Sequence, residues 1–217
     1  MMRVLGKGPS RLTPQLCHQC QDYASQYLGG TEIELSMLFA DVRGSTPMAE
    51  KLGPVQFSRL ISRFFATASD LLIRHRAMVD RLAGDQATGL FVPGFAGSNH
   101  REQALITAQE LLHATGHHRA EGPWIPVGIG IHTGVAFVGS VGSEGSATDI
   151  TVLGDPANVA ARLCSAAAAG EILVSREAAQ GIDTQRMEHR ELDLKGKSQR
   201  VSVFVWRQLT ETSAAAS

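Results

Sequence analysis

The sequence predicts an α+β sandwich with a mainly antiparallel sheet, a ferredoxin-like βαββαβ core and flanking helices. The main reason is the order of its segments: strand, helix, two strands, helix and strand, followed by further strands and helices. The strand segments are short and apolar, and the helix segments have apolar residues at helical spacing. An apolar content of 43% in 217 residues is ordinary for one large domain, or for one domain with an appendage.

The first half of the core is expected to contain a strand at residues 33–41 and a long helix at residues 54–76. The strand segment ends in a turn that contains Gly44. In the helix segment apolar residues recur at helical spacing, and Pro54 suits the first turn of a helix.

A hairpin is expected next, with strands at residues 78–83 and 87–92. Gly84 and Asp85 separate the two strands, which places Asp85 near the turn. A second amphipathic helix is expected at residues 101–115.

The second half begins with a glycine-rich run at residues 124–142, which is predicted to form a pair of strands, followed by a strand at 149–154. A helix should then begin with Asp155 as its N-cap and Pro156 in the first helical position. The last two strands are expected at residues 171–174 and 201–206.

Three regions are expected along the chain. Residues 1–30 form an appendage with a short helix at 14–28, residues 31–208 form the folded domain, and residues 209–217 form a flexible tail.

The composition excludes several classes of protein. A formal net charge of −1 gives no basic field for nucleic acid, and no apolar run reaches the roughly 18 residues of a membrane span. The N-terminus is not followed by the apolar region of a signal peptide. Three cysteines form no disulfide framework, so the sequence is expected to be a cytoplasmic protein with reduced thiols.

Two aspartates are candidate metal ligands. Asp41 and Asp85 each follow a short apolar run at the point where the chain turns, and the fold makes the first strand and the first hairpin neighbours. Two carboxylates brought together repel each other unless cations lie between them, and Mg²⁺ prefers carboxylate, phosphate and water oxygens. The alternative is that each is an ordinary turn residue beside glycine.

The segment after Asp41 is a candidate phosphate loop. Val42, Arg43, Gly44, Ser45 and Thr46 lie between the first strand and a helix, where backbone N–H groups can hold phosphate and Gly44 allows close approach. A plain strand-to-helix turn with a Ser or Thr cap is the alternative.

A polar pair is expected on the helix that begins at Asp155. Asn158 and Arg162 are four residues apart and therefore share one face. Arginine can stabilise charge that builds on a reacting phosphoryl group, and asparagine can position a ribose. Taken alone, the pair is also what a solvated helix surface would carry.

These segments, LFADVRGST, RLAGDQATGLF, DITVLGDPANVAARL and ELDLKGKSQRVSVFVW, resemble the class III nucleotide cyclases from about Glu32 to Trp206. The resemblance implies the class III cyclase sandwich, with residues 31–208 as the catalytic domain. It implies that two divalent cations, Mg²⁺ or Mn²⁺, bind Asp41, Asp85 and the carbonyl of Val42. Asn158 and Arg162 would be catalytic, and Lys195 would bind the terminal phosphates.

The family resemblance also implies a head-to-tail homodimer. In this family the metal aspartates of one subunit face the asparagine and arginine of the other, and this chain keeps both sets.

The expected base pocket departs from the family pattern. Adenylyl cyclases usually carry Lys four residues before the second metal Asp, where this chain has Arg81; guanylyl cyclases usually carry Glu there. Thr151, seven residues before Asn158, resembles the Thr-bearing bacterial branch of adenylyl cyclases. Arg81 is a planar fork with several donors, which suits adenine N1 or a carbonyl-bearing pyrimidine. An Arg81 that pairs with Asp80 or Glu50 would leave the base alone.

The predicted reaction is the conversion of ATP to 3′,5′-cyclic AMP and pyrophosphate. Alternatives are a cyclase for UTP, CTP or GTP, a nucleotide-binding module without catalysis, and an unrelated phosphotransferase, although no GGDEF-like segment of a diguanylate cyclase occurs. Cys17 and Cys20 form a CxxC pair that is half a zinc site, a redox pair, or two thiols in a packing helix.

Overall fold

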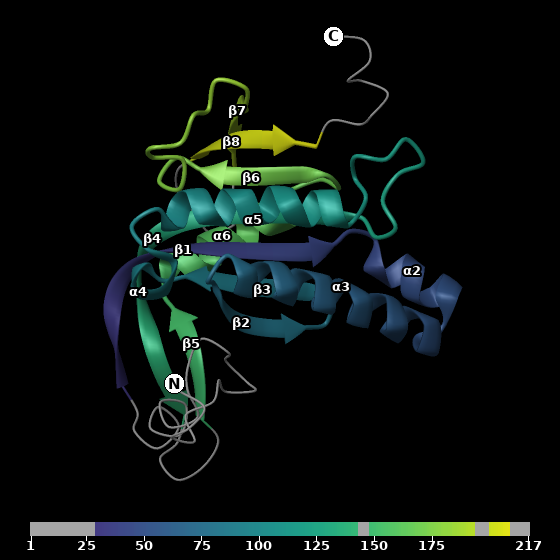
Figure 1. Cartoon of the computed structure of the whole chain (residues 1–217), viewed down its shortest axis with the longest axis horizontal. Helices are drawn as coiled ribbons and strands as arrows, with labels where there is room; N and C mark the ends of the chain where they lie inside the picture. Colours follow the sequence, from purple (N-terminus) through teal and green to yellow (C-terminus); the bar gives the residue numbers. More distant parts are fainter. Residues whose placement is uncertain (1–28, 143–147, 194–199, 209–217) are drawn as a thin grey trace.

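The computed structural model describes residues 29–142, 148–193 and 200–208 of the chain. These residues form a single mixed sheet with helices on both faces (Figure 1). The strands are β1 (Gly29–Val42), β2 (Met78–Ala83), β3 (Gln86–Phe91), β4 (Val127–Gly142), β5 (Thr148–Leu153), β6 (Glu171–Ser175), β7 (Glu188–Leu192) and β8 (Val201–Arg207). The helices are α2 (Ser45–Leu52), α3 (Pro54–Arg74), α4 (Pro93–Ala96), α5 (His100–Ala114) and α6 (Asp155–Ala166).

The strand order is β2-β3-β1-β4-β6-β8-β7, with β5 paired to β4. Every described pairing is antiparallel except that of β4 with β6. The mainly antiparallel α+β sheet predicted from the sequence is therefore confirmed.

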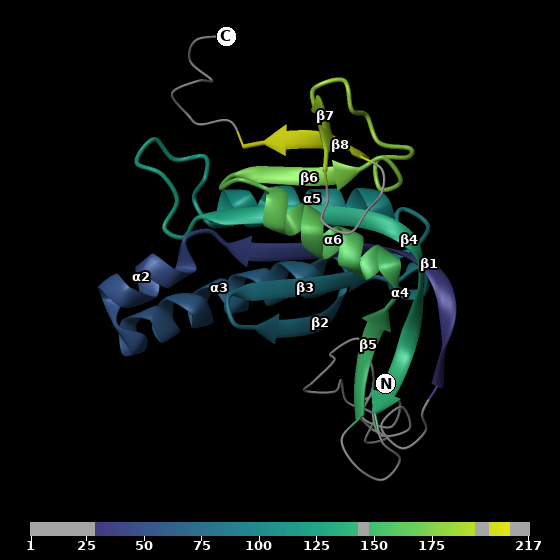
Figure 2. The same ribbon diagram turned by 180° about the vertical axis from the view of Figure 1, so that it is seen from behind.

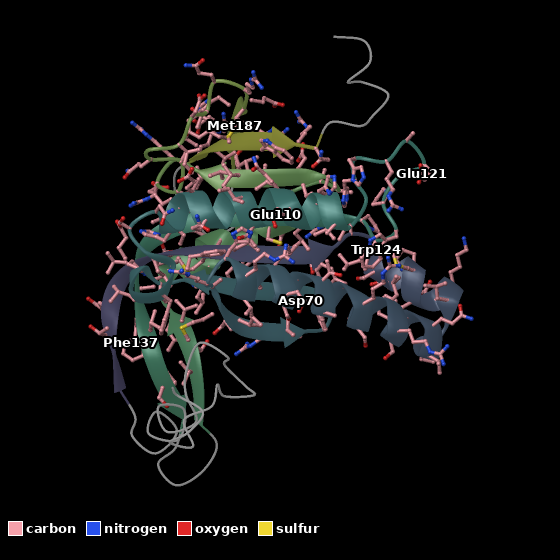
Figure 3. The ribbon with its side chains drawn as sticks, viewed as in Figure 1. Asp70, Glu110, Glu121, Trp124, Phe137 and Met187 are labelled. Carbon is pink, nitrogen blue, oxygen red and sulfur yellow. The ribbon has the colours of Figure 1, made fainter. Side chains whose placement is uncertain are left out.

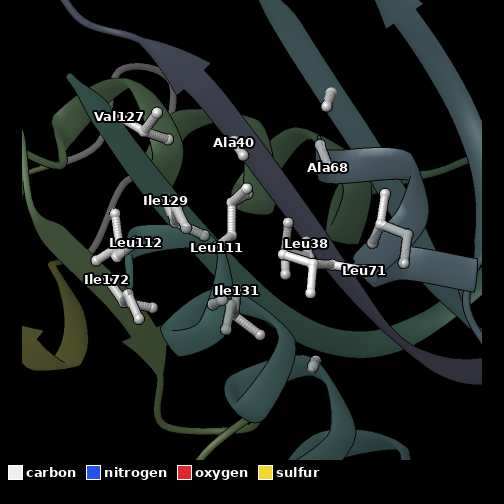
Figure 4. Close-up of a cluster of buried hydrophobic side chains, with 14 of the residues drawn as sticks. Leu38, Ala40, Ala68, Leu71, Leu111, Leu112, Val127, Ile129, Ile131 and Ile172 are labelled. Carbon is white, nitrogen blue, oxygen red and sulfur yellow. The ribbon is translucent and has the colours of Figure 1, made fainter. Parts of the chain in front are cut away.

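Helices α3 and α5 lie on one face of the sheet, whereas Figure 2 shows α6 on the other face. Between the sheet and the first pair of helices lies a fully apolar cluster (Figure 4). In it, Leu38 of β1 and Ile131 of β4 pack with Leu71 of α3 and Leu111 of α5, all at most 6% exposed. This cluster holds α3 and α5 on the sheet, and smaller apolar clusters form between the sheet and α6 on the other face.

The glycine-rich run forms one continuous 16-residue strand, β4, so the predicted pair of strands is wrong. Its glycines do not turn the chain; they let other backbone come close. A Cβ at Gly130 would lie 2.2 Å from the N atom of Cys164 on α6, and one at Gly139 would lie 2.5 Å from the Cα of Gly30 on β1. The second half of β4, with β5 and the start of β1, extends beyond the helices as an arm (Figures 1 and 2).

The start of α6 also differs from the prediction. Asp155 is the first helical residue, and Gly154 is the N-cap with φ 137° and no side-chain capping hydrogen bond. Glycine adopts this positive φ without strain, so the chain passes directly from β5 into α6. Pro156 is therefore the second helical residue, one position later than predicted, and still lies in the first turn, where its missing N–H costs no hydrogen bond.

The remaining predicted strands and helices are present, with ends shifted by a few residues. Strand β7 and the short helices α2 and α4 are additional elements to which the sequence analysis assigned no range. The predicted N-terminal helix, with Cys17 and Cys20, lies outside the described residues. Among the helices of the described part, none is long and apolar enough to cross a membrane.

Candidate active site

The two candidate metal aspartates meet where β1 ends beside the β2–β3 turn. Asp41 is the penultimate residue of β1 and pairs with Gln86 of β3, while Asp85 lies in the turn just before Gln86. The backbone N–H of Val42 donates a hydrogen bond to the carbonyl oxygen of Asp85, with an N–O distance of 3.2 Å. The sheet register therefore brings together two aspartates that are 44 residues apart in sequence.

The carboxylates of Asp41 and Asp85 interact directly. Burial raises the pKa of Asp41 to about 6; the neighbouring Arg43 opposes this rise, and the charge of Asp85 and a side-chain hydrogen bond with it add to it. Such mutual repulsion is what a bound cation would relieve.

Arg43 joins this carboxylate pair to the helix on the same face of the sheet. Its Nη2 atom lies 2.7 Å from Oδ2 of Asp41 and donates to Sγ of Cys164 at 3.6 Å, and its Nη1 donates to the carbonyl oxygen of Ser165 at 3.4 Å. A Cβ at Gly128 would lie 2.9 Å from Nε of Arg43, so the absence of a side chain there makes room for the guanidinium. The sequence analysis placed Arg43 in the candidate phosphate loop but assigned its side chain no role, although its position two residues after Asp41 was a usable signal.

The donor set fits a hard divalent cation. The described part of the chain has no group of three or more His, Cys, Asp or Glu side chains that would enclose a metal. Two carboxylates alone leave most coordination positions to backbone oxygens, water and substrate phosphates, which is how proteins commonly hold Mg²⁺. Asp41, Asp85 and the carbonyl of Val42 would hold such ions.

The predicted phosphate loop forms the start of α2. Gly44 is the N-cap residue with φ 68° and ψ 28°, a left-handed conformation that favours glycine, and it has no side-chain capping hydrogen bond. Ser45 and Thr46 are the first helical residues, and neither is buried. The first backbone N–H groups of a helix have no partner within the helix and can bind an anion.

A second cluster of predicted site residues lines a pocket of about 240 Å³. Arg81 comes from β2, Thr151 from β5 and Asn158 from α6. The described lining contains neither Asp41 nor Asp85. Three further polar residues line the pocket and were assigned no role in binding from the sequence: Asp80, Gln86 and Thr88. The ring of Phe39 adds an apolar wall.

Helix α6 presents the predicted catalytic pair on its open side. Val159 and Leu163 are at most 4% exposed and pack against the sheet, while Asn158 is exposed and Arg162 is half-buried. The shared face predicted for Asn158 and Arg162 thus looks away from the core, although Arg162 does not line the 240 Å³ pocket. Lys195 lies outside the described residues.

Comparison with known proteins identifies related domains. Residues 31–207 match the family described as the adenylate and guanylate cyclase catalytic domain. An uncharacterized protein of Mycobacterium tuberculosis (strain ATCC 25618 / H37Rv) is 32% identical over 165 residues, which are 75% of this chain and 29% of that protein. An uncharacterized protein of Mycobacterium bovis matches over the same shares. The chain therefore spans less than a third of the length of these curated relatives.

Two solved structures show the same fold. The guanylyl cyclase Cya2 is 25% identical with a TM-score of 0.72, and the match covers 84% of this chain and 96% of Cya2. The adenylyl cyclase CyaB from P. aeruginosa is 24% identical with a TM-score of 0.70, over 84% of this chain and 100% of CyaB.

Proposed function

Because this chain belongs to the adenylate and guanylate cyclase catalytic domain family, we propose that it converts ATP to 3′,5′-cyclic AMP and pyrophosphate. The observation that carries the proposal is the 240 Å³ pocket in which Arg81, Thr151 and Asn158 converge from three elements. Pockets for whole drug-sized ligands measure about 300–1,000 Å³, so this one suits a part of a nucleotide, such as the base and ribose edge.

The residues have distinct roles in this proposal. Arg81 donates a hydrogen bond to N1 of adenine, Thr151 contacts its 6-amino group, and Asn158 positions the ribose. The N–H groups at the start of α2, from Gly44 to Thr46, and Lys195 bind the phosphates. Arg162 stabilises the negative charge that builds on the α-phosphate as the 3′-hydroxyl attacks.

Asp41, Asp85 and the carbonyl of Val42 would hold two divalent cations beside the phosphates. When bound, such a pair lowers the pKa of the attacking hydroxyl and neutralises charge on the phosphates. The direct interaction between the two carboxylates supports this assignment.

We further propose that the active form is a head-to-tail homodimer with two composite sites. Within one chain the aspartate pair and the pocket with Asn158 are separate clusters, which agrees with each serving a different composite site. A lone chain should then be inactive.

Product identification tests the proposed reaction. The purified chain is incubated separately with ATP, GTP, CTP and UTP, first with Mn²⁺ and then with Mg²⁺, and cyclic products are identified by mass spectrometry. We expect cyclic AMP from ATP, and no product from Asp41→Asn or Asp85→Asn. The matched control Asp70→Asn, on the exposed side of α3, should keep the wild-type rate (Figure 3).

A second candidate is a guanylyl cyclase, which the similarity to Cya2 favours. Cyclic GMP as the main product would establish this alternative, and cyclic UMP or CMP would make the chain a pyrimidine cyclase with Arg81 as a specificity residue. No cyclic product from any nucleotide would contradict the enzyme proposal and leave a nucleotide-binding module.

A further inference from the structure

Strand β2 contains an irregularity beside the pocket. Met78 and Val79 pair with Leu90 and Gly89 of β3, but the next pair joins Arg81 to Thr88. One residue, Asp80, is therefore extra on β2. Such bulges often lie next to active sites, where they redirect a side chain.

The bulge changes which face of the sheet Arg81 occupies. Met78 packs in the apolar cluster on the α6 side, and Val79 packs against the cluster on the α3 side. In a regular strand, successive side chains lie on opposite faces of the sheet, so Asp80 would lie on the α6 side and Arg81 on the α3 side. Because of the extra residue, Asp80 and Arg81 instead both line the 240 Å³ pocket, together with Thr88.

The pocket thereby contains a carboxylate next to a guanidinium. An arginine only donates hydrogen bonds, whereas an ionised aspartate only accepts them. Thr151, which comes from β5, does both, so its hydroxyl cannot by itself distinguish an amino group from a carbonyl. Asp80 is the group in this lining that favours an amino group and disfavours a carbonyl oxygen.

The other walls suit a flat, largely apolar ring. Phe39 of β1 and Val152 and Leu153 of β5 line the pocket with Ala157 and Ala161 of α6. Apolar walls with a few polar groups are typical of small-molecule sites, in which the polar groups fix orientation and provide specificity.

We propose that Asp80 is a specificity-determining residue that accepts a hydrogen bond from the 6-amino group of adenine while Arg81 donates to N1. The inference rests on the proposed function for the identity of the ligand as a nucleoside triphosphate. It adds a carboxylate, supplied by a bulge, to a pocket whose sequence pattern indicated only Arg81 and Thr151 as base-reading residues.

The test combines the removal of the Asp80 side chain with the removal of the 6-amino group of the ligand, in the manner of a double-mutant cycle. The full chain with Mn²⁺ is titrated with 3′-deoxy-ATP and with 3′-deoxy purine riboside triphosphate, which lacks only the 6-amino group, and displacement of a fluorescent triphosphate is measured. Neither ligand has the 3′-hydroxyl, so neither is consumed. We expect wild type to prefer the adenine compound by about tenfold, the strength of a hydrogen bond to a charged group. Asp80→Ala should reduce this preference to about twofold by weakening only the adenine compound, and the remainder is the contact of Thr151 with the same amino group.

The control is Asp70→Ala, which removes an exposed aspartate on α3 and should keep the tenfold preference. An unchanged preference in Asp80→Ala overturns the proposal, as does a wild type that binds both compounds equally. If Asp80→Ala fails to fold, Asp80→Asn takes its place; its preference should also fall, because a neutral amide oxygen accepts more weakly than a carboxylate.

Binding and turnover separate this inference from the proposed reaction. A chain that makes no cyclic product but shows the Asp80-dependent preference contradicts only the cyclase proposal. A chain that makes cyclic AMP with the same preference in wild type and Asp80→Ala contradicts only the role of Asp80.

Discussion

At the scale of single residues, Arg43 joins the candidate metal site at the end of β1 to the last turn of α6 within one chain. Its guanidinium contacts the Asp41 carboxylate on one side and the last turn of α6, at Cys164 and Ser165, on the other. Burial raises the pKa of the Cys164 thiol to about 12, so this thiol stays protonated and serves as a packing partner. The C-terminal end of a helix carries partial negative charge, which also favours a cation at this position.

We predict that Arg43→Lys lowers the cyclisation rate without unfolding the chain. A lysine can keep a point charge near Asp41 but has no planar fork to contact Ser165 at the same time. The expected loss in kcat is about tenfold, and Arg43→Gln should lose more. Rates at saturating ATP and Mn²⁺, with melting temperatures for each variant, measure this; Arg186→Gln, an exposed arginine in the segment between β6 and β7, is the control. A wild-type kcat in Arg43→Gln would show that the bridge is dispensable.

Glu171 is a buried charged residue of β6, the strand between β4 and β8. It is 6% exposed at the start of β6 and accepts hydrogen bonds from the backbone N–H of Ala168, from Arg190 of β7 and from Arg207 of β8. Burial raises the pKa of Glu171, but these hydrogen bonds and the charge of Arg190 outweigh burial and hold the pKa below its ordinary value of 4.5.

The lowered pKa gives a pH dependence of stability with a definite sign. The folded state binds the Glu171 proton less tightly than the unfolded state, so its stabilisation is complete above pH 4.5 and disappears as the pH falls through the lower folded pKa. Glu171→Gln should reduce the free energy of unfolding at pH 7 by about 1.5 kcal/mol, because a neutral amide binds the two arginines more weakly than the carboxylate, while both arginines keep Glu188 as a partner. The deficit should shrink below pH 4.5. Urea unfolding from pH 3 to 8 measures it, with Glu121→Gln in an exposed loop as control (Figure 3); a deficit that is constant with pH would contradict the assignment.

At the scale of elements, the packing of α6 on β4 determines where Asn158 and Arg162 lie. The two elements touch through backbone at Gly130, where a Cβ would lie 2.2 Å from the N atom of Cys164 and 2.6 Å from the carbonyl oxygen of Ala160. Distances below 3.0 Å to backbone atoms cannot be relieved by a side-chain rotation, so helix and strand would have to separate.

Gly130→Ala is therefore expected to destabilise the fold by about 3 kcal/mol, the upper end of the usual cost of overpacking, and to abolish product formation. Denaturant unfolding gives the first quantity and the cyclic product assay the second. Gly94→Ala is the matched control, because a Cβ at Gly94 of α4 meets no atom within 4 Å and its φ is not positive. Equal midpoints for Gly130→Ala and wild type would show that α6 is not held by this contact.

The packing of each element explains whether it could be predicted from the sequence. The helix at α3 was predictable because its apolar residues, such as Phe64 and Leu71, repeat at helical spacing and are buried in that pattern. The continuity of β4 was not predictable, because glycines that admit a neighbouring backbone look the same in sequence as glycines that turn the chain. The face of the sheet on which Arg81 lies was also not predictable, because a bulge of one residue cannot be recognised from the sequence of a six-residue strand.

At the scale of the whole molecule, the site residues divide into two clusters on a single chain. Asp41 and Asp85 lie at the end of β1, and Asn158 lines the pocket with Arg81 between β2, β5 and α6. In a two-fold symmetric dimer, the aspartate pair of each subunit faces the Asn158 pocket of the other subunit. Both composite sites therefore contain the same set of residues. This division is why the proposed enzyme is a homodimer and why its activity should depend on protein concentration.

Mixing two inactive variants tests this arrangement. Asp41→Ala removes the metal half and Arg162→Ala the transition-state half, so each homodimer has two broken sites. In an equal mixture with free exchange, half of the dimers combine the variants and have one intact site out of two, which gives about a quarter of the wild-type rate. Asp41→Ala mixed with Asp85→Ala is the control: every site then has a broken metal half, and the mixture should stay inactive. An Asp41→Ala and Arg162→Ala mixture as inactive as its parents, under conditions in which labelled subunits exchange, would mean that each chain builds its site alone.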